Sequence, residues 1–231
     1  MKITDLMRQQ GEFCLHIPSA TFETGKIHGI IGGNGSGKTT LAKLITGILS
    51  PDRGSIDYEG LTQQDITMTG QKPYLLHTSV YQNLVYPLKI RHMQPKKEVV
   101  EYWLEKAGLQ HKQKQYALSL SSGEQQKLSF IRALIFQPKL VIVDETLSNL
   151  DPDSVHLFES IMLEEQQRHP ITWITISHQL VHISKLCDQV HFMEGGQLLQ
   201  SGTPEQILYH PTHPSVIQYL SNTEVSFKGR M

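Results

Sequence analysis

An α/β fold with a mostly parallel central sheet is predicted by three features of the sequence. The segments Lys26–Ile31, Lys139–Val143 and Ile171–Ile176 are short apolar runs of the type found in buried parallel strands. The last two are separated by Asp153–Arg168, which has a helical pattern, so strand and helix alternate. The first runs into a glycine-rich loop and then into a helix over Thr40–Gly47. Together these elements predict a doubly wound sheet.

Short β segments in the first part of the chain predict a smaller antiparallel element beside this core. Pro51-Asp52-Arg53-Gly54 is a turn that leads into one of them, and another stops at Gly70-Gln71. The strands predicted in this part are Lys2–Thr4, Glu12–Ile17, Ala20–Phe22, Ser55–Tyr58 and Asp65–Thr69.

The stretch 73–120 is predicted to be a mostly helical subdomain inserted into the core. Pro95–Ala107 is amphipathic, and Gly108 is placed to end this helix. Its apolar positions i, i+1, i+4, i+5 and i+8 are Val99, Val100, Trp103, Leu104 and Ala107. At 231 residues the chain can bury one sizeable core, so we expect one domain over 1–231.

Composition excludes several classes of protein. Lys and Arg number 21 against 22 Asp and Glu, so no basic field points to nucleic acid as a partner. Cys14 and Cys187 are isolated and are expected to be reduced thiols in a cytosolic protein. The sequence has no signal peptide and no apolar run near the ~20 residues needed to span a bilayer. If the protein acts at a membrane, we expect another chain to bring it there.

The glycine-rich loop carries the first chemical motif, GxxxxGK[ST], which is a phosphate-binding loop. Its glycines let backbone N–H groups approach phosphates, Lys38 reaches the β and γ oxygens, and the Thr39 hydroxyl ligates Mg²⁺. A glycine-rich loop without a nucleotide would not explain Lys38-Thr39 at this offset. The residues predicted to bind a nucleoside triphosphate are Gly33, Asn34, Gly35, Ser36, Gly37, Lys38, Thr39 and Thr40.

Two adjacent carboxylates, Asp144 and Glu145, end a predicted buried strand. This places them at the carboxyl edge of the sheet, where open α/β folds bind ligands. Asp144 is expected to hold Mg²⁺, directly or through water, and Glu145 to polarise a water as a general base. Such a pair is common by itself, and its pairing with the phosphate loop favours function.

A third motif, Leu120-Ser121-Ser122-Gly123-Glu124-Gln125-Gln126, precedes a predicted helix. Ser121 and Glu124 form a capping box, so a capped helix with no further role is one interpretation. His178 follows a predicted strand, where a lone histidine is more often structural. The spacing of His178 and His182 would also fit a metal pair on a helix, although no third ligand is apparent.

The order of these motifs resembles the ATP-binding cassette (ABC) family over nearly the whole chain. The stretch from Leu120 resembles the family signature, usually LSGGQ, upstream of the Asp-Glu strand. Gln71 lies at the place of the Q-loop glutamine, Ser148-Asn149-Leu150-Asp151 resembles the D-loop, and His178 resembles the switch histidine. The resemblance implies an ABC-type P-loop NTPase fold, ATP as the nucleotide and Mg²⁺ as the metal.

The resemblance also implies a site shared by two cassettes packed head to tail. Each ATP would lie between one phosphate loop and the signature of the other chain, here the Ser121 hydroxyl and the Gly123 N–H, with Asp151 nearby. Gln71 would link the Mg²⁺ site to the helical subdomain. The implied catalytic residues are Glu145, His178 and Gln71, and the implied metal residues are Thr39, Gln71 and Asp144.

Some positions depart from the family pattern without removing a catalytic group. Ser122 stands for a usual glycine, Glu124 for a frequent glutamine, Lys127 for an arginine, and Thr146 for the usual proline. The aromatic residue that stacks on adenine in the family is not clearly aligned. Gln9 and Gln10 fall near its place, and Phe13 is the nearest candidate.

The end of the chain resembles that of stand-alone importer cassettes, in Gly202-Thr203-Pro204-Glu205-Gln206-Ile207 and His210-Pro211-Thr212-His213-Pro214. The segments 71–76 and 85–91 are similar to tungstate and molybdate-type oxyanion importers, although amino-acid importers share much of the pattern. The implied partners are transmembrane permease subunits, a second cassette in a homo- or heterodimer, and a solute-binding protein, at the cytoplasmic face of the membrane. A weakly hydrolysing regulatory cassette and a non-transport ABC ATPase remain the alternatives.

Overall fold

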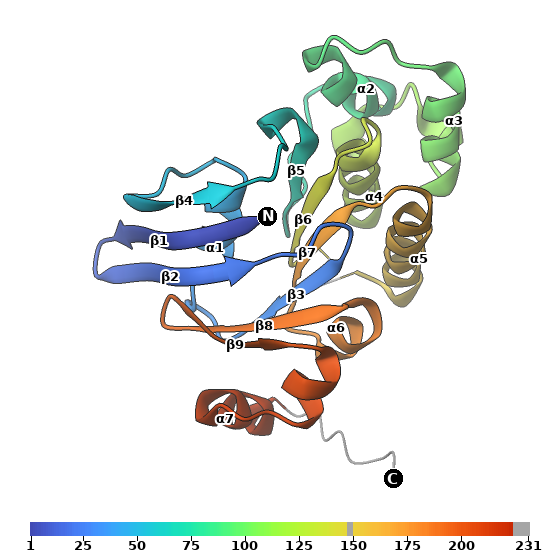
Figure 1. The fold of residues 1–231 in the computed structure, drawn as a ribbon. Helices are drawn as coiled ribbons and strands as arrows, with labels where there is room; N and C mark the ends of the chain where they lie inside the picture. The colour runs from blue at the N-terminus through green and yellow to red at the C-terminus, as the bar shows by residue number, and fades with distance from the viewer. Residues whose placement is uncertain (147–149, 224–231) are drawn as a thin grey trace.

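A small antiparallel sheet lies beside a larger central sheet (Figure 1). The computed structural model describes residues 1–146 and 150–223. In this part of the chain, the small sheet has the order β2-β1-β4. Its strands are β1 (Lys2–Gln10), β2 (Phe13–Thr21) and β4 (Arg53–Asp57). β1 and β2 form a hairpin in which Gln10 pairs with Phe13.

The central sheet, in the described residues, has six strands in the order β5-β6-β7-β3-β8-β9. They are β3 (Ile27–Ile31), β5 (Ile66–Thr69), β6 (Leu140–Asp144), β7 (Thr172–Ile176), β8 (Gln189–Glu194) and β9 (Gln197–Gly202). All neighbouring pairs are parallel except β8 and β9. The carboxyl ends of β3, β6 and β7 therefore meet at one edge, the edge at which such sheets bind ligands.

Helices cover both faces of the central sheet. They are α1 (Lys38–Ile45), α2 (Val80–Ile90), α3 (Lys97–Lys106), α4 (Ser122–Leu134), α5 (Pro152–Arg168), α6 (Leu180–Leu186) and α7 (Pro214–Asn222). Short 3₁₀ turns occur at Gln63–Asp65, Gln110–Lys112 and Ala117–Ser119, and a π-helical turn at Glu205–Tyr209. Among the described residues, none of these helices is long and apolar enough to cross a membrane.

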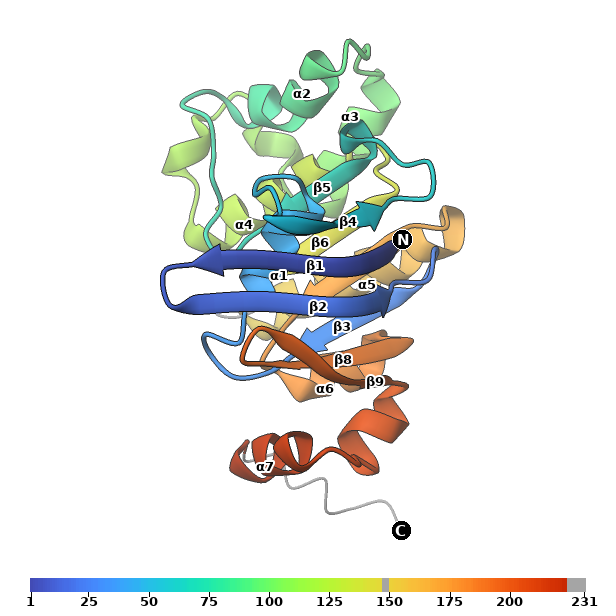
Figure 2. The same ribbon diagram turned by 60° about the vertical axis from the view of Figure 1, so that its left-hand side comes forward.

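The hydrophobic core has two parts, one on each face of the central sheet. β6 shows why, because its side chains alternate: Leu140 and Ile142 pack toward α1 and the small sheet, while Val141 and Val143 pack toward α4 and α5. Figure 2 shows α1 close to both sheets. α1 is thus fixed by packing on two sides, which holds its N-terminus and the loop before it in place.

The predicted α/β fold with an antiparallel sheet and a helical stretch between 73 and 120 is confirmed. α2 and α3 gather at the end of the molecule away from α7 (Figure 2). Two predictions are wrong in detail: the strand predicted over Lys2–Thr4 extends to Gln10, and those predicted over Glu12–Ile17 and Ala20–Phe22 are replaced by a single strand, β2. Pro18 lies within this strand, which is possible because β2 is an edge strand, where prolines are tolerated. The strands β8 and β9 and the helices α6 and α7 were not predicted.

Candidate nucleotide-binding and hydrolysis site

The phosphate loop joins β3 to α1 and needs glycine at two close approaches. Gly32 has φ +146°, and a Cβ there would lie 2.0 Å from the Met193 carbonyl oxygen. Gly37 has φ +103°, and a Cβ there would lie 2.8 Å from Cζ of Phe13. Any side chain at either position would force neighbouring atoms to move. The glycines of the predicted motif are therefore the residues that the conformation of the loop requires.

Lys38, at the first turn of α1, is buried, with 6% of its surface exposed. Its Nζ donates to the carbonyl oxygens of Gly32 at 2.9 Å and Gly33 at 2.8 Å, and lies 3.3 Å from the Ser36 hydroxyl. Burial lowers the pKa of Lys38, and the carboxylates of Glu145 and Asp144 act in the opposite direction. A buried ammonium at a loop of backbone N–H groups is suited to bind phosphate oxygens.

Asp144, the last residue of β6, faces Thr39 on α1. The Thr39 hydroxyl donates to Oδ2 of Asp144 at 2.9 Å. Oδ1 of Asp144 is buried and has no hydrogen-bond partner among the described residues. Burial raises the pKa of Asp144. A hydroxyl beside a carboxylate oxygen that no described residue contacts by a hydrogen bond fits Mg²⁺, which takes one or two protein ligands and completes its shell with phosphates and water.

Glu145 has a left-handed backbone, φ +51°, which costs a non-glycine residue about 1–3 kcal/mol. Its N–H donates to the Ile176 carbonyl at 2.9 Å, which ties it to the end of β7. Its Oε1 lies 2.8 Å from Nε2 of His178. Two residues more than thirty positions apart are thus paired, because β6 and β7 end side by side at the sheet edge.

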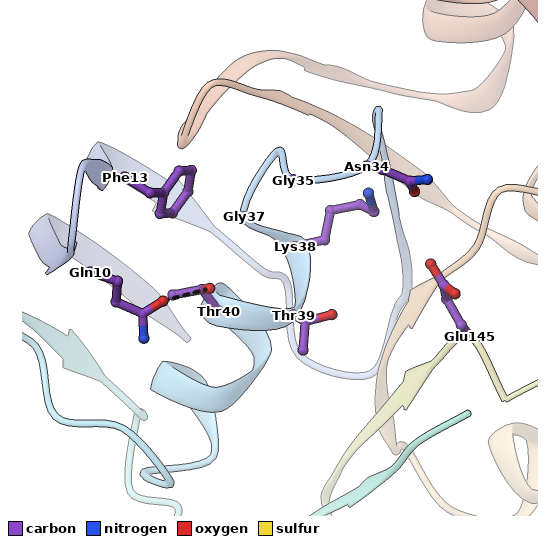
Figure 3. A pocket seen from close by; sticks show the side chains of 9 residues that line it. All are labelled: Gln10, Phe13, Asn34, Gly35, Gly37, Lys38, Thr39, Thr40 and Glu145. Carbon is purple, nitrogen blue, oxygen red and sulfur yellow. Dashed lines mark hydrogen bonds between the residues drawn. The ribbon is translucent and has the colours of Figure 1, made fainter. Parts of the chain in front are cut away.

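A cavity of about 560 Å³ lies in front of the loop (Figure 3). Glu145 lies across this cavity from the loop that carries Lys38 and Thr39, and Phe13 stands on the other side of the loop. The lining residues are Gln10, Phe13, Asn34, Gly35, Gly37, Lys38, Thr39, Thr40 and Glu145. The volume and the convergent polar groups fit a nucleotide.

Gln10 is the lining residue that the sequence analysis noted but did not assign. The Thr40 hydroxyl lies 3.5 Å from its Oε1. Gln10 also pairs with Phe13 across the hairpin, so both reach the cavity from the same turn. Gly11 could have identified Gln10 from the sequence, because a turn at Gly11 places Gln10 opposite Phe13. The role of Phe13 toward adenine stays a prediction.

The signature segment lies away from this cavity. Ser121 caps α4, because its hydroxyl accepts from the Glu124 N–H at 3.4 Å and the Glu124 carboxylate accepts from the Ser121 N–H at 3.1 Å. The capping box is confirmed. Gly123 lies beside Asp151, since a Cβ on it would be 3.8 Å from Oδ2 of Asp151. Ser121 is exposed, and neither it nor Gly123 lines the cavity of its own chain.

Two other predicted site residues, Gln71 and Asp151, do not line the nucleotide cavity. Gln71 is exposed just after β5 and does not line the cavity, so its proposed contact with Mg²⁺ stays a prediction. Asp151 caps α5 by accepting from the Ser154 N–H at 2.8 Å and hydroxyl at 2.7 Å. Ser148 and Asn149 of the D-loop stretch lie outside the described residues.

The alternative of a metal pair at His178 and His182 has no support in the described residues. His178 pairs with Glu145, whereas Nδ1 of His182 lies 2.6 Å from Oε1 of Glu159. Within residues 1–146 and 150–223 no group of three His, Cys, Asp or Glu side chains could hold a metal ion.

The fold is shared with solved transporter components. The structure of an ATP-binding subunit of an ABC transporter superposes with a TM-score of 0.80 at 23% identity, covering 89% of this chain and 90% of that one. CbiO1 of Clostridium perfringens, part of the ABC transporter complex cbiONQ, gives a TM-score of 0.74 at 25% identity, covering 89% of each chain.

Proteins with similar sequences are also named as ATP-binding proteins of transport systems. The tungstate uptake system ATP-binding protein TupC of Peptoclostridium acidaminophilum is 35% identical over 81% of this chain and 91% of its own length. The methionine import ATP-binding protein MetN 1 of Listeria monocytogenes is 32% identical over 90% of this chain, which spans 66% of that relative. Residues 15–148 match the ABC transporter family. From the phosphate loop, the paired carboxylates and these matches, the chain belongs to the ABC transporter family and is one of its ATPases.

Proposed function

We propose that this chain is the ATP-hydrolysing subunit of an ABC importer, and that it drives solute import through separate transmembrane subunits. The observation that carries the proposal is the pair of Glu145 and His178 at the sheet edge, facing the phosphate loop across the cavity. The relatives named for tungstate uptake and methionine import support the direction of transport. They also support a peripheral location at the cytoplasmic face of the membrane, with a solute-binding protein as a further partner.

ATP is proposed to lie in the cavity with its phosphates on the loop. Lys38 would exchange its carbonyl partners for β and γ oxygens, and Phe13 and Gln10 would contact the base and ribose side. Thr39 and Asp144, with Gln71, would hold Mg²⁺, which when bound neutralises charge that develops on the phosphates. The unpartnered Oδ1 of Asp144 supports this assignment.

Hydrolysis requires a water aligned with the γ-phosphorus and a group that takes its proton. As the water oxygen bonds to phosphorus, the bond to the β–γ bridging oxygen breaks, and the Glu145 carboxylate accepts the proton. His178, 2.8 Å from this carboxylate, would hold it in orientation. The strained backbone of Glu145 supports a functional role, because such conformations persist only where the surroundings impose them.

A head-to-tail dimer would complete the site. Ser121 and Gly123 stand on the surface, away from the cavity of their own chain. The N-terminus of α4 at Ser121 is suited to an anion, and such an anion would have to come from another molecule. We therefore assign these two residues, with Asp151, to the ATP of a second cassette.

A groove between α2 and α4 is the proposed seat of the permease. It encloses about 320 Å³, and its exposed apolar residues include Tyr74, Tyr86 and Ile90. Its lining residues are Thr67, Met68, Tyr74, Leu76, Tyr86, Pro87, Ile90, Arg91, Ser129, Arg132, Ala133 and Phe136. The proposed occupant is a short amphipathic helix on the cytoplasmic side of the transmembrane subunit, which such an apolar groove with two arginines suits.

The test is hydrolysis by the Glu145→Gln variant. We expect the unmodified chain to hydrolyse ATP, and chelation of Mg²⁺ to stop the reaction. Glu145→Gln should bind ATP, lose turnover by about 100-fold or more, and accumulate as an ATP-bound dimer. The exposed Glu105→Gln on α3 is the control, with unchanged rates.

Two results would count against the proposal. Turnover of Glu145→Gln within about twofold of the unmodified chain would remove Glu145 from the reaction. ATP binding by the unmodified chain with little hydrolysis would favour the second candidate, a weakly hydrolysing regulatory cassette, which the departures Ser122 and Thr146 suggest.

A further inference from the structure

The residue after Glu145 is held by a buried hydrogen bond that the proposed mechanism does not use. Thr146 is 1% exposed, and its hydroxyl lies 2.8 Å from that of Thr69, which is 4% exposed. Thr69 is the last residue of β5 and stands two positions before Gln71. The bond therefore joins the residue that follows Glu145 to the end of β5, just before the loop that carries Gln71.

A third buried side chain, that of Gln126 on α4, contacts the segments on both sides of this bond. Gln126 is 3% exposed, and its Nε2 donates to the Gly70 carbonyl at 3.2 Å and to the Thr146 carbonyl at 3.3 Å. The Gln126 amide thus binds the segment after β5 and the segment after β6 at the same time. Because Ser121 caps the N-terminus of α4, Gln126 connects them to the helix that would present the signature to a second cassette.

These contacts lie next to Glu145, whose backbone is strained. Glu145, with φ +51°, is tied on its N-terminal side to Ile176, and the residue that follows it is fixed by Thr69 and Gln126. A strained conformation lasts only where its neighbours determine it. With buried partners, loss of one hydroxyl leaves the other unsatisfied, so the arrangement resists movement.

We propose that Thr69, Gln126 and Thr146, here called the Thr146 junction, are positioning residues that aim the Glu145 carboxylate at the γ-phosphate. The inference rests on the proposed ATPase function and deepens it. None of the three junction residues lines the nucleotide cavity, and Thr146 is the chain neighbour of Glu145, which does. The junction therefore acts on turnover and leaves nucleotide binding unchanged.

The experiment compares four variants by kcat, KM and nucleotide affinity. Thr146→Val should lower kcat about tenfold, a drop of the size that one hydrogen bond supports, with KM for ATP unchanged. Thr69→Val should do the same, and the double variant should lose no more than either alone, because both remove one bond. Thr146→Ser keeps the hydroxyl and should restore kcat.

A matched control separates positioning from loss of stability. Thr172 is also buried in the sheet, 3% exposed, and its hydroxyl accepts from the Gly25 N–H at 3.0 Å, at the opposite end of β7. Thr172→Val removes a comparable bond and should leave kcat unchanged. Gln126→Met, which keeps the length of the side chain without its donor, should lower kcat as Thr146→Val does.

Failure of this inference differs from failure of the proposed function. If the unmodified chain hydrolyses ATP, Glu145→Gln does not, and Thr146→Val turns over at the unmodified rate, only the junction is overturned. The same conclusion follows if Thr172→Val slows turnover as much as Thr146→Val, or if the losses of the two threonine variants add in the double variant. Absence of hydrolysis in the unmodified chain would overturn the proposed function itself.

Discussion

At the scale of single residues, Lys38 is the group whose role depends most on burial. Its ammonium has lost most of its water and is held by two loop carbonyls and a hydroxyl. Phosphate oxygens carry full charge and form stronger bonds with an ammonium than neutral carbonyls do. Binding of a nucleotide should therefore be coupled to a change of partner at this side chain.

Lys38→Ala is expected to weaken nucleotide binding about 10- to 100-fold, the range for loss of a hydrogen bond to a charged group. Titration with a fluorescent ATP analogue measures this. Lys43→Ala, at an exposed position in the last turn of the same helix, is the control and should bind as the unmodified chain does. Unchanged affinity in Lys38→Ala would contradict the phosphate-loop assignment.

The residues predicted from the sequence were those whose spacing is local. The phosphate loop follows from nine consecutive residues, and Asp144-Glu145 from the strand before it. Residues that meet only through the fold were missed. Thr69 and Gln126 meet Thr146 from elements that are far apart in the chain, and no periodicity in the sequence marks such a contact.

At the scale of elements, one carboxylate fastens α6 to α5. Glu159 on α5 is 3% exposed, and its two oxygens lie 2.6 Å from Nδ1 of His182 and 2.5 Å from Nζ of Lys185, both on α6. These bonds hold the pKa of Glu159 below its ordinary value against the effect of burial. Since α6 follows His178 directly, this contact also fixes the position of the histidine beside Glu145.

Glu159→Ala should lower the free energy of unfolding by about 1.5–3 kcal/mol, because His182 and Lys185 lose a buried, charged hydrogen-bond partner. Urea denaturation provides the measurement. Glu164→Ala, on the same helix, removes the more exposed pair with Lys106 and should cost less than about 1 kcal/mol. Equal losses in the two variants would show that the Glu159 contact contributes no more than a surface ion pair.

The elements predicted well were the buried strands and amphipathic helices, because burial imposes a clear apolar pattern. β6 and β7 are fully buried; β6 lies one residue further along the chain than predicted, and β7 begins one residue later and ends at the predicted residue. The strands β8 and β9 were missed because their pattern is mixed: His191 is buried among apolar neighbours, and β9 is only partly buried. A buried histidine in a strand gives no hydrophobic signal.

At the scale of the whole molecule, two buried histidines make stability depend on pH. His28 Nε2 lies 3.0 Å from the Glu23 carbonyl, so this nitrogen carries the proton. Its Nδ1 then accepts from Nε2 of His191 at 3.1 Å, and Nδ1 of His191 accepts from the Ser201 hydroxyl at 2.8 Å. Both rings are therefore neutral, and burial lowers the pKa of His28 and brings that of His191 to about 3.

A lowered pKa in the folded state means that the unfolded chain binds the proton first. Stability from this pair is complete above about pH 6.5 and falls as the pH drops toward 3. Between pH 7.5 and pH 5, His191 alone should remove about 2 kcal/mol from the free energy of unfolding. The loss should shrink in His191→Leu and persist in the exposed control His111→Ala. An undiminished loss in His191→Leu would contradict the assignment.

At the scale of the whole molecule, the proposed sharing of each ATP by two cassettes has its simplest form in a pair of copies of this chain. It predicts that the exposed Ser121 lies in the contact between copies when ATP is bound. In a Glu145→Gln background, which retains ATP, a bulky cation at Ser121 should then block association without blocking nucleotide binding. Ser160→Arg, on the exposed side of α5, is the control and should not interfere.

The most direct test is the mass of the Glu145→Gln chain with and without ATP, measured by size-exclusion chromatography with light scattering. We expect a dimer in ATP for Glu145→Gln and for Glu145→Gln with Ser160→Arg, and a monomer that still binds ATP for Glu145→Gln with Ser121→Arg. An ATP-dependent dimer that forms equally well with Ser121→Arg would contradict the shared site.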